Sequence, residues 1–520
     1  MDSEILVIGS GIAGLSFALK ASEYAFVVLV TKDKISESNT KYAQGGLAAV
    51  SGEDDSFELH VKDTLRAGDG LCDKEAVEFL VKNAPSQIEW LRKIGVEFDS
   101  ELSNEAVHSA KRIVHSGDIT GERVSDVLVE KVKASDRIKV FEGCQAVELV
   151  VEDGKCVGCD VLDVAKGDVF RVSASGVVLA TGGLGRVFKN TCNPEIATGD
   201  GFALAFNAGA ELIDMEFVQF HPTGLYGSDP IFLISETLRG EGGHLRNKDG
   251  EIYMLKYHRD GELAPRDVVS KFSVDEMKRT GTDHVFLDLT HMDSEYLVNR
   301  FPKIHKKCLE YGVDLTKDKI PVAPTAHYSC GGVKIDLNGC SSVPGLYAIG
   351  EVSCSGLHGA DRLASNSLTE GLVFGESLSE YLKDKVNERS IELKIIKNDD
   401  LTKKNINNKI SINNEIIIKI KEIKEKIQSI MWEKVGIIRS EKDLSEALEV
   451  IKEIEEEVNG FSGVSKELVE LKNLILVSKV ITFCALRRKE SRGTHFISEY
   501  AVRDDKEWAN HLVVDKESFQ

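Results

Sequence analysis

A glycine-rich motif near the start of the chain has the spacing that binds the phosphates of a nucleotide. The spacing GxGxxG is matched by Gly9, Ser10, Gly11, Ile12, Ala13 and Gly14. In this pattern the glycines permit a tight turn, and they bring a pyrophosphate close to a helix N-terminus that favours anions. The motif alone is a modest signal, because a purely structural glycine turn has the same residues.

The elements around the motif strengthen this prediction. Residues 5–8 form a short apolar run, residues 15–21 have helical spacing, and residues 26–30 form a second apolar run. A strand, a turn, a helix and a strand are the order that a dinucleotide site requires. The second strand ends at Thr31 and Lys32, without the acid that usually binds the adenosine ribose, which weakens an NAD prediction. Lys32 either serves the nucleotide or is a solvated surface lysine.

Two later segments favour flavin over nicotinamide. Residues 177–183 and 345–351 are apolar runs that end in glycine, and they resemble the later strands of FAD-dependent enzymes with the two-dinucleotide fold. In such enzymes the second of these strands ends in an acid that contacts the ribityl chain, and Glu351 takes that place here. Three segments in this order predict FAD as the cofactor.

Strands that lie far apart in the sequence imply that a second domain is inserted between them. We expect an α/β fold with a Rossmann-like FAD-binding domain over residues 1–213 and 329–386. An inserted α+β capping domain would cover residues 214–328, and a C-terminal helical domain would cover residues 387–520. Apolar residues at helical spacing indicate these helices. Residues 394–413 are either helical or a mobile linker.

Composition narrows the class of protein. The 65 Lys+Arg and 85 Asp+Glu residues give a net charge of −20, which argues against nucleic acid or an anionic membrane as the main partner. The start is acidic and there is no apolar run of about 18 residues, so we expect neither a signal peptide nor a membrane span. The ten cysteines are sparse, and the CxxC of Cys156 and Cys159 lacks the second pair of a metal site. We predict a cytoplasmic protein without a metal.

Six further motifs resemble the flavoprotein family of succinate dehydrogenase, fumarate reductase and L-aspartate oxidase. They are SNTKYAQGG at 38–46, TGDG at 198–201, HPT at 221–223, APRD at 264–267, AHY at 326–328 and the segment from Arg362 to Leu368. The resemblance covers residues 2–385 and returns at 487–495. It implies that FAD contacts, besides the glycine motif, Lys32, Ser38, Asn39, Thr40, Lys41, Tyr42, Ala43, Gln44, Gly45, Gly46, Gln145, Ala146, Thr181, Gly182, Asp200, Glu351, Ser367 and Leu368.

Asn39 predicts how the cofactor is held. Membrane-associated members of the family attach FAD through a histidine in a Ser-His-Thr segment, whereas this chain has Ser38, Asn39 and Thr40. An amide cannot form that bond, so we expect FAD without a covalent link. The matches around residues 42–50 and 351–368 are also closer to the aspartate oxidases than to other members.

The resemblance also implies a pocket for a dicarboxylate. Arg362 would clamp one carboxylate with two parallel hydrogen bonds, while His221 and His327 donate to the other end. Each residue alone is equally compatible with a structural role, and their shared motif positions carry the prediction. Further substrate contacts would come from Thr223, Ser235, Glu236 and Ser365.

Arg266 and Glu105 are the predicted catalytic residues. The resemblance gives Arg266 the role of proton donor or acceptor, yet a free guanidinium scarcely deprotonates at neutral pH. A relay through Glu236 or Asp267 and a purely electrostatic role are therefore both open. Glu105 stands where aspartate oxidases have an acid that meets the substrate ammonium, although the local match is imperfect. Glu101 is the competing candidate, and a solvated loop acid is the alternative.

The implied activity is oxidation of L-aspartate to iminoaspartate, with fumarate or oxygen as the electron acceptor. In this family iminoaspartate feeds quinolinate synthase and NAD biosynthesis, and a transient contact with that enzyme is conceivable. One alternative is a soluble fumarate reductase or a succinate dehydrogenase flavoprotein subunit, against which Asn39 and Glu105 argue. Another is a partner-binding flavoprotein whose acidic helical C-terminus docks an iron-sulfur or quinone-linked subunit.

Overall fold

The computed structural model describes residues 2–387 and 414–519, so the segment 394–413 with its two alternatives lies outside the described residues. Its largest sheet has the order β5-β2-β1-β8-β7-β6, with β15 also beside β8. β5, β2, β1, β8 and β15 pair with one another in parallel, whereas β7 pairs antiparallel with both β8 and β6. The strands are β1 (Asp2–Ile8), β2 (Val27–Val30), β5 (Ile138–Phe141), β6 (Cys144–Glu152), β7 (Lys155–Asp163), β8 (Asp168–Leu179) and β15 (Leu346–Ala348).

The parallel strands end at a glycine turn that positions the first helix. At Gly9 φ is 113°, and a Cβ there would lie 2.1 Å from the carbonyl oxygen of Ala180. A Cβ at Gly14 would lie 2.1 Å from the carbonyl oxygen of Gly9, so a side chain fits at neither position. α1 (Ile12–Ala21) therefore starts directly above the sheet and packs on α11 (Asn366–Asn387).

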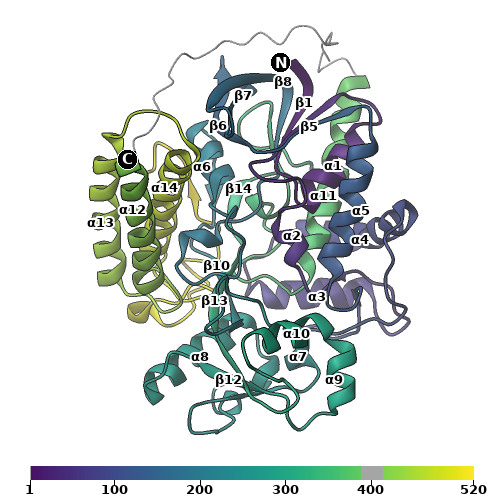
Figure 1. Ribbon diagram of the computed structural model, residues 1–520, viewed down its shortest axis with the longest axis vertical. Coiled ribbons are helices and arrows are strands. Elements are labelled where there is room, and N and C mark those ends of the chain that lie inside the picture. The colour runs from purple at the N-terminus through teal and green to yellow at the C-terminus, as the bar shows by residue number, and fades with distance from the viewer. Residues whose placement is uncertain (1, 388–413, 520) are drawn as a thin grey trace.

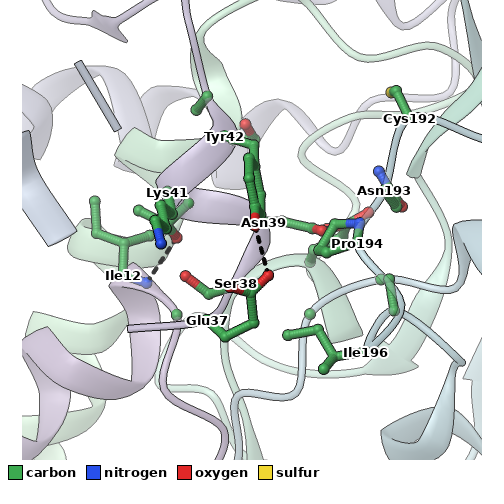
Figure 2. Close-up of a pocket in the computed structure, with 18 of the residues that line it drawn as sticks. Ile12, Glu37, Ser38, Asn39, Lys41, Tyr42, Cys192, Asn193, Pro194 and Ile196 are labelled. Carbon is green, nitrogen blue, oxygen red and sulfur yellow. Dashed lines mark hydrogen bonds between the residues drawn. The ribbon is translucent and has the colours of Figure 1, made fainter. Parts of the chain in front are cut away.

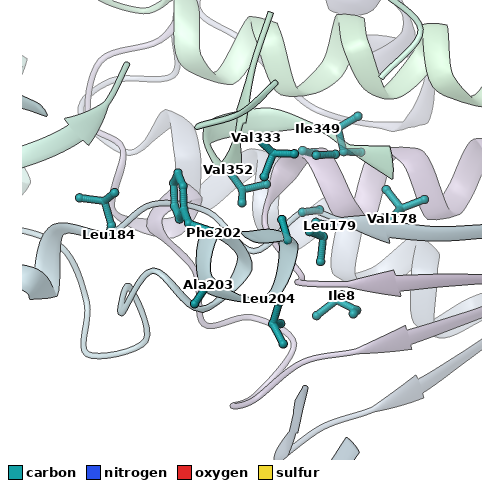
Figure 3. Close-up of a cluster of buried hydrophobic side chains, with 14 of the residues drawn as sticks. Ile8, Val178, Leu179, Leu184, Phe202, Ala203, Leu204, Val333, Ile349 and Val352 are labelled. Carbon is teal, nitrogen blue, oxygen red and sulfur yellow. The ribbon is translucent and has the colours of Figure 1, made fainter. Parts of the chain in front are cut away.

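Helices cover this sheet and bury its apolar strands (Figure 1). β2 is buried along its whole length, as expected for a parallel strand covered on both faces. Figure 3 shows Ile8 of β1, Leu179 of β8 and Ile349, which directly follows β15, in one apolar cluster with Phe202 of α6 (Asp200–Asn207). The flanking helices are α2 (Asn39–Tyr42), α3 (Phe57–Ala67), α4 (Lys74–Ile94), α5 (Thr120–Ala134) and α6 (Asp200–Asn207).

A second sheet belongs to the segment between β9 (Leu212–Ile213) and β14 (Gly332–Lys334) and lies in the lower part of Figure 1. Its order is β10-β13-β12-β11, and the register of β10 against β13 shifts between His221 and Gly224. Such irregularities re-aim side chains at the edge of a site. The elements are β10 (Val218–Leu225), β11 (His244–Arg246), β12 (Val285–Asp288), β13 (Ile320–Ser329), α7 (Thr237–Gly240), α8 (Arg266–Thr280), α9 (Ser294–Arg300) and α10 (Pro302–Glu310).

The C-terminal region is helical but does not consist of helices alone. The apolar faces of α12 (Asn414–Lys434), α13 (Glu441–Asn459) and α14 (Lys466–Arg487) pack together. Beyond them β17 (Val513–Val514) pairs with β9 (Leu212–Ile213) in a sheet of order β16-β14-β9-β17. The two remaining strands of that sheet are β14 (Gly332–Lys334) and β16 (Ser353–Cys354), and β3 (Leu47–Ala48) pairs with β4 (Ile113–Val114) elsewhere.

Ion pairs fasten the C-terminal region to the rest of the chain. Arg488 is fully buried and pairs with Glu216 at 2.5 Å and with Glu490 at 3.1 Å. Arg492 pairs with Glu490 at 2.7 Å and donates to the backbone oxygen of Asp69 at 2.8 Å. These contacts hold structure together and do not reach the main cavity.

The predicted fold class is confirmed: an α/β sheet domain, a second mixed region and a helical C-terminal region are all present. The predicted domain boundaries remain a proposal. None of the described helices is long and apolar enough to span a membrane.

Candidate active site

A cavity of about 950 Å³ extends from the glycine turn to the second sheet. This is near the upper end of the usual range for ligand pockets. Figure 2 shows one part of it, where Ser38, Asn39 and Tyr42 face Asn193, Pro194 and Ile196. Every predicted site residue lines this cavity except Gly14 and Thr223.

The two exceptions have structural tasks. Gly14 lies behind the turn, where it lets α1 approach Gly9. Thr223 is fully buried, its hydroxyl donates to the carbonyl oxygen of Ile234 at 2.8 Å, and its backbone amide donates to Nδ1 of His221 at 3.3 Å. The structure thus gives Thr223 a supporting role behind His221, and a direct substrate contact by Thr223 stays a prediction.

We call the end of the cavity beside the glycine turn its upper part and the end beside the second sheet its lower part. The residues of the upper part fit FAD by their chemistry. Some buried polar atoms have no hydrogen-bond partner among the described residues, and they belong to residues that line this part: Oγ of Ser38, Oδ1 of Asn39, both amide atoms of Gln145 and Oγ1 of Thr181. Buried polar groups are rarely left unpaired, so this cluster calls for a polar ligand. A Cβ at Gly182 would meet nothing within 4 Å, which leaves room beside the strand ends. A nucleotide with several hydrogen-bonding groups suits these atoms and the α1 N-terminus.

Glu351 is an acid that lines this part of the cavity. Its Oε1 accepts from the Ser329 amide at 3.2 Å, and its Oε2 accepts from Nδ2 of Asn39 at 3.3 Å. Burial raises the pKa of Glu351 to about 7, although these hydrogen bonds oppose the shift. Asn39 therefore has a second use, because it orients the acid predicted to face the ribityl chain.

Two arginines meet in the lower part of the cavity. Arg266 begins α8, and its Nε donates to Glu236 while its Nη1 donates to Oε1 of Gln219 at 2.9 Å. Nη2 of Arg362 donates to the same Gln219 oxygen at 2.9 Å, and Nε of Arg362 is buried with no partner in the part of the chain that the structure describes. The unpaired donor on Arg362 suits a carboxylate ligand.

The charges of this cluster are set by mutual contacts. Burial alone would lower the pKa of Arg266, but Glu236 and Glu105 raise it above the usual value. Burial alone would raise the pKa of Glu236, but Arg266 and Arg239 lower it. Arg266 therefore stays protonated and positively charged, and Glu236 stays an ionised carboxylate. Of the two proposed relay acids, Glu236 touches Arg266, whereas Asp267 does not line the cavity.

The two histidines lie edge to face, with ring centroids 5.2 Å apart. Burial lowers the pKa of both His221 and His327 well below the usual value, and Arg266 adds to the shift. Both rings are consequently neutral at physiological pH. Because the Thr223 amide donates to Nδ1 of His221, the ring proton sits on Nε2, which leaves His221 a donor.

The sequence left two candidates, Glu105 and Glu101, for the acid that meets the substrate ammonium, and the structure distinguishes them. Glu105 is buried, lines the cavity and accepts a hydrogen bond from Oγ of Ser365, whereas Glu101 is exposed and lies outside the cavity. Burial, followed by the nearby charge of Glu236, raises the pKa of Glu105. Ser235 and Ser365 also line the cavity, as predicted.

Two residues of this site were missed from the sequence. Gln219 joins Arg266 to Arg362, and its position two residues before His221 on β10 is the signal that could have revealed it, since alternate strand residues share a face. Tyr328 lies under Arg362, whose guanidinium carbon is 4.2 Å from the ring centroid. Its hydroxyl donates to Glu370 at 2.9 Å, which fixes the ring.

Replacing Gln219 with leucine should lower kcat/KM for the substrate about thirtyfold, because each guanidinium loses a hydrogen bond of the charged kind. Steady-state kinetics would measure this, and the flavin content of the purified variant should stay at one per chain. The matched control is Gln87→Leu, which removes a buried amide that pairs with Lys20 away from the cavity. Equal losses in both variants would mean that Gln219 matters only for folding.

Comparisons with known proteins define the class. Residues 4–368 match the FAD binding domain family, and residues 424–520 match the fumarate reductase flavoprotein C-terminal family. The FrdA chain of E. coli quinol fumarate reductase is 30% identical, with a TM-score of 0.89 and coverage of 99% of this chain and 94% of that one. The protein is an FAD-dependent flavoprotein of the succinate dehydrogenase and fumarate reductase class.

Curated relatives narrow the class to a family. The L-aspartate oxidase of Yersinia pestis is 42% identical, with 96% of each chain covered. That of Acinetobacter baylyi is 41% identical, covering 96% of this chain and 93% of its own length. The chain belongs to the L-aspartate oxidase family.

Proposed function

We propose that this protein oxidises L-aspartate to iminoaspartate and passes the electrons to fumarate or oxygen, as the first step of de novo NAD biosynthesis through quinolinate. The observation that carries the proposal is the buried Glu105, a second acid in the lower cavity beside Glu236, which Arg266 already pairs. A dicarboxylate without an amine has no use for a buried anion there. An ammonium group taken out of water requires one.

Different residues of the lower cavity would bind the two carboxylates and the ammonium group of the substrate. Arg362 presents an unpaired guanidinium N–H to one carboxylate, and the neutral His221 and His327 donate to the other. Glu105 accepts from the ammonium, with Ser365 holding its carboxylate in place. FAD, when bound, supplies the two-electron acceptor for the oxidation.

Arg266 would act as a fixed cation near the reacting carbon. Its raised pKa opposes a simple loss of its proton, and its partner Glu236 is the adjacent group that can exchange one. We therefore favour electrostatic stabilisation by Arg266, with proton exchange confined to the contact between Arg266 and Glu236.

The alternative is fumarate reduction or succinate oxidation as the main activity. The structural similarity to the E. coli fumarate reductase chain supports this alternative. Anaerobic mixing of the FAD-loaded protein with L-aspartate, and separately with succinate, distinguishes the two. We expect L-aspartate to bleach the oxidised flavin absorbance and succinate to leave it unchanged. Bleaching by succinate alone would move the protein to the dehydrogenase branch.

FAD should leave the protein when the chain unfolds, because Asn39 offers no atom for a covalent bond to the flavin. After acid precipitation we expect all of the flavin in the supernatant, and no fluorescent protein band on a denaturing gel. A fluorescent band would show a covalent link through some other residue and would refute this prediction.

Two finer proposals concern the setting of the enzyme. We propose a cytoplasmic location, supported by the sparse cysteines, all of which are free among the described residues. A transient contact with quinolinate synthase is proposed because iminoaspartate must reach the next enzyme. Cross-linking of the purified pair during turnover would test this contact.

A further inference from the structure

A buried cluster joins the nucleotide end of the cavity to a helix of the C-terminal region. Lys32 follows β2, and its ammonium group donates to Oγ1 of Thr198 at 2.6 Å, Oδ2 of Asp200 at 2.7 Å and Oε1 of Glu470 at 2.9 Å. Asn473 donates from Nδ2 to Oδ1 of Asp200 at 2.9 Å. Lys32 and Asp200 line the cavity, whereas Glu470 and Asn473 come from α14 and stand behind them.

The hydrogen bonds of this cluster show which group remains free for a ligand. An ammonium group has three N–H bonds, and Lys32 directs them at three acceptors. Lys32 therefore has no donor left for a nucleotide. Oδ1 of Asp200 accepts only from Asn473 among the described residues, so one of its lone pairs stays available.

Asp200 occupies the place of an acid that the sequence lacks. In dinucleotide-binding folds an acid at the end of the second strand accepts hydrogen bonds from the adenosine ribose. Here that strand ends at Thr31 and Lys32, and the ion pair with Lys32 holds Asp200, the first residue of α6, beside this strand end. Burial alone would raise the pKa of Asp200, but Lys32 lowers it, so the group remains an acceptor.

We propose that Glu470 and Asn473 are positioning residues for FAD: by fixing Lys32 and Asp200 they hold the free acceptor of Asp200 toward the adenosine ribose. All four side chains are at most 13% exposed, so water does not substitute for the contacts. Docking of α14 and binding of FAD are therefore linked. The inference rests on FAD as the cofactor and is independent of the substrate.

The charges around the cluster agree with this assignment. Lys424 on α12 lies 3.8 Å from the second oxygen of Glu470. Glu470 thus balances two lysines, while Asp200 faces one lysine and two neutral donors. Removing Glu470 would leave Lys32 and Lys424 with one carboxylate between them and would free Lys32 to move.

The test is titration of the flavin-free protein with FAD and with ADP, which carries only the adenosine end. Asn473→Leu leaves Asp200 without its α14 donor, and we expect about tenfold weaker binding of both ligands, as the loss of a hydrogen bond to a charged group implies. Glu470→Gln should weaken both in the same direction. The matched control is Glu467→Gln, which makes the same change at an exposed position of α14 and should alter neither affinity.

Unchanged affinities in both variants would overturn the proposal, and so would weaker FAD binding with unchanged ADP binding, since the defect would then lie elsewhere in the cavity. Thermal unfolding of each flavin-free variant checks that it is folded. If Asn473→Leu does not fold, Glu470→Gln and the milder Asn473→Gln decide the question. Neither titration contains aspartate, so a failure of the proposed substrate would not change the reading of these results.

Discussion

Replacing Arg266 with leucine should lower kcat for L-aspartate by at least about a thousandfold while leaving FAD bound. Loss of one preorganised group that stabilises a transition state costs about 10²–10³ in kcat, and loss of a positioned proton-transfer group costs a similar factor. Arg266 provides the first function as a buried cation and takes part in the second through its contact with Glu236, while Gln219 holds it in the lower cavity. The measurement is the anaerobic rate of flavin bleaching, with the flavin to protein ratio determined on the same sample.

The variant also leaves Glu236 buried without its nearest cation, which could destabilise the fold. A double variant, Arg266→Leu with Glu236→Gln, removes that charge and should recover thermal stability without recovering turnover. Arg279→Leu is the matched control, because Arg279 lies half-exposed near the other end of α8. If the double variant turned over aspartate at a normal rate, Arg266 would have only a structural role.

The fold was predictable because its signals are local. The glycine motif, the apolar strands and the helical spacing each involve residues close in sequence. The pairing of β17 with β9 was not predictable. Two-residue strands carry no periodicity, and nothing near residue 513 points to a partner 300 residues earlier.

The site residues likewise fall into those that could be predicted from the sequence and those that could not. Residues in motifs, such as Arg266 and His327, were found by type and position and do line the cavity. Contacts between distant segments were not found: Lys32 and Glu470 are 438 positions apart, and only the folded chain brings them to 2.9 Å. The choice between Glu101 and Glu105 needed burial, which a loop sequence does not reveal. Val107, beside Glu105, has φ of 72°, a conformation that no β-branched residue signals in advance.

Glu105→Gln should lower kcat/KM for L-aspartate about a hundredfold or more and leave fumarate reduction within about threefold of its original value. An amide has no charge to pair with the substrate ammonium, and burying an unpaired charge costs several kcal/mol. Fumarate has no amine, so it makes no use of Glu105. Kinetics with both substrates on one preparation measures the change, and Glu101→Gln is the matched control at an exposed position four residues away.

The pH dependence adds an independent check on Glu105. Burial raises the pKa of this carboxyl group, so in the free enzyme it becomes an anion only as pH rises through a value above the usual carboxyl range. Because the anion is the form that binds ammonium, kcat/KM for L-aspartate should rise with pH through that raised pKa. Glutamine does not titrate, so the variant should lose this rising limb. A limb that persists in Glu105→Gln would have to come from another group, and equal losses with aspartate and fumarate would assign Glu105 to folding in place of amine selection.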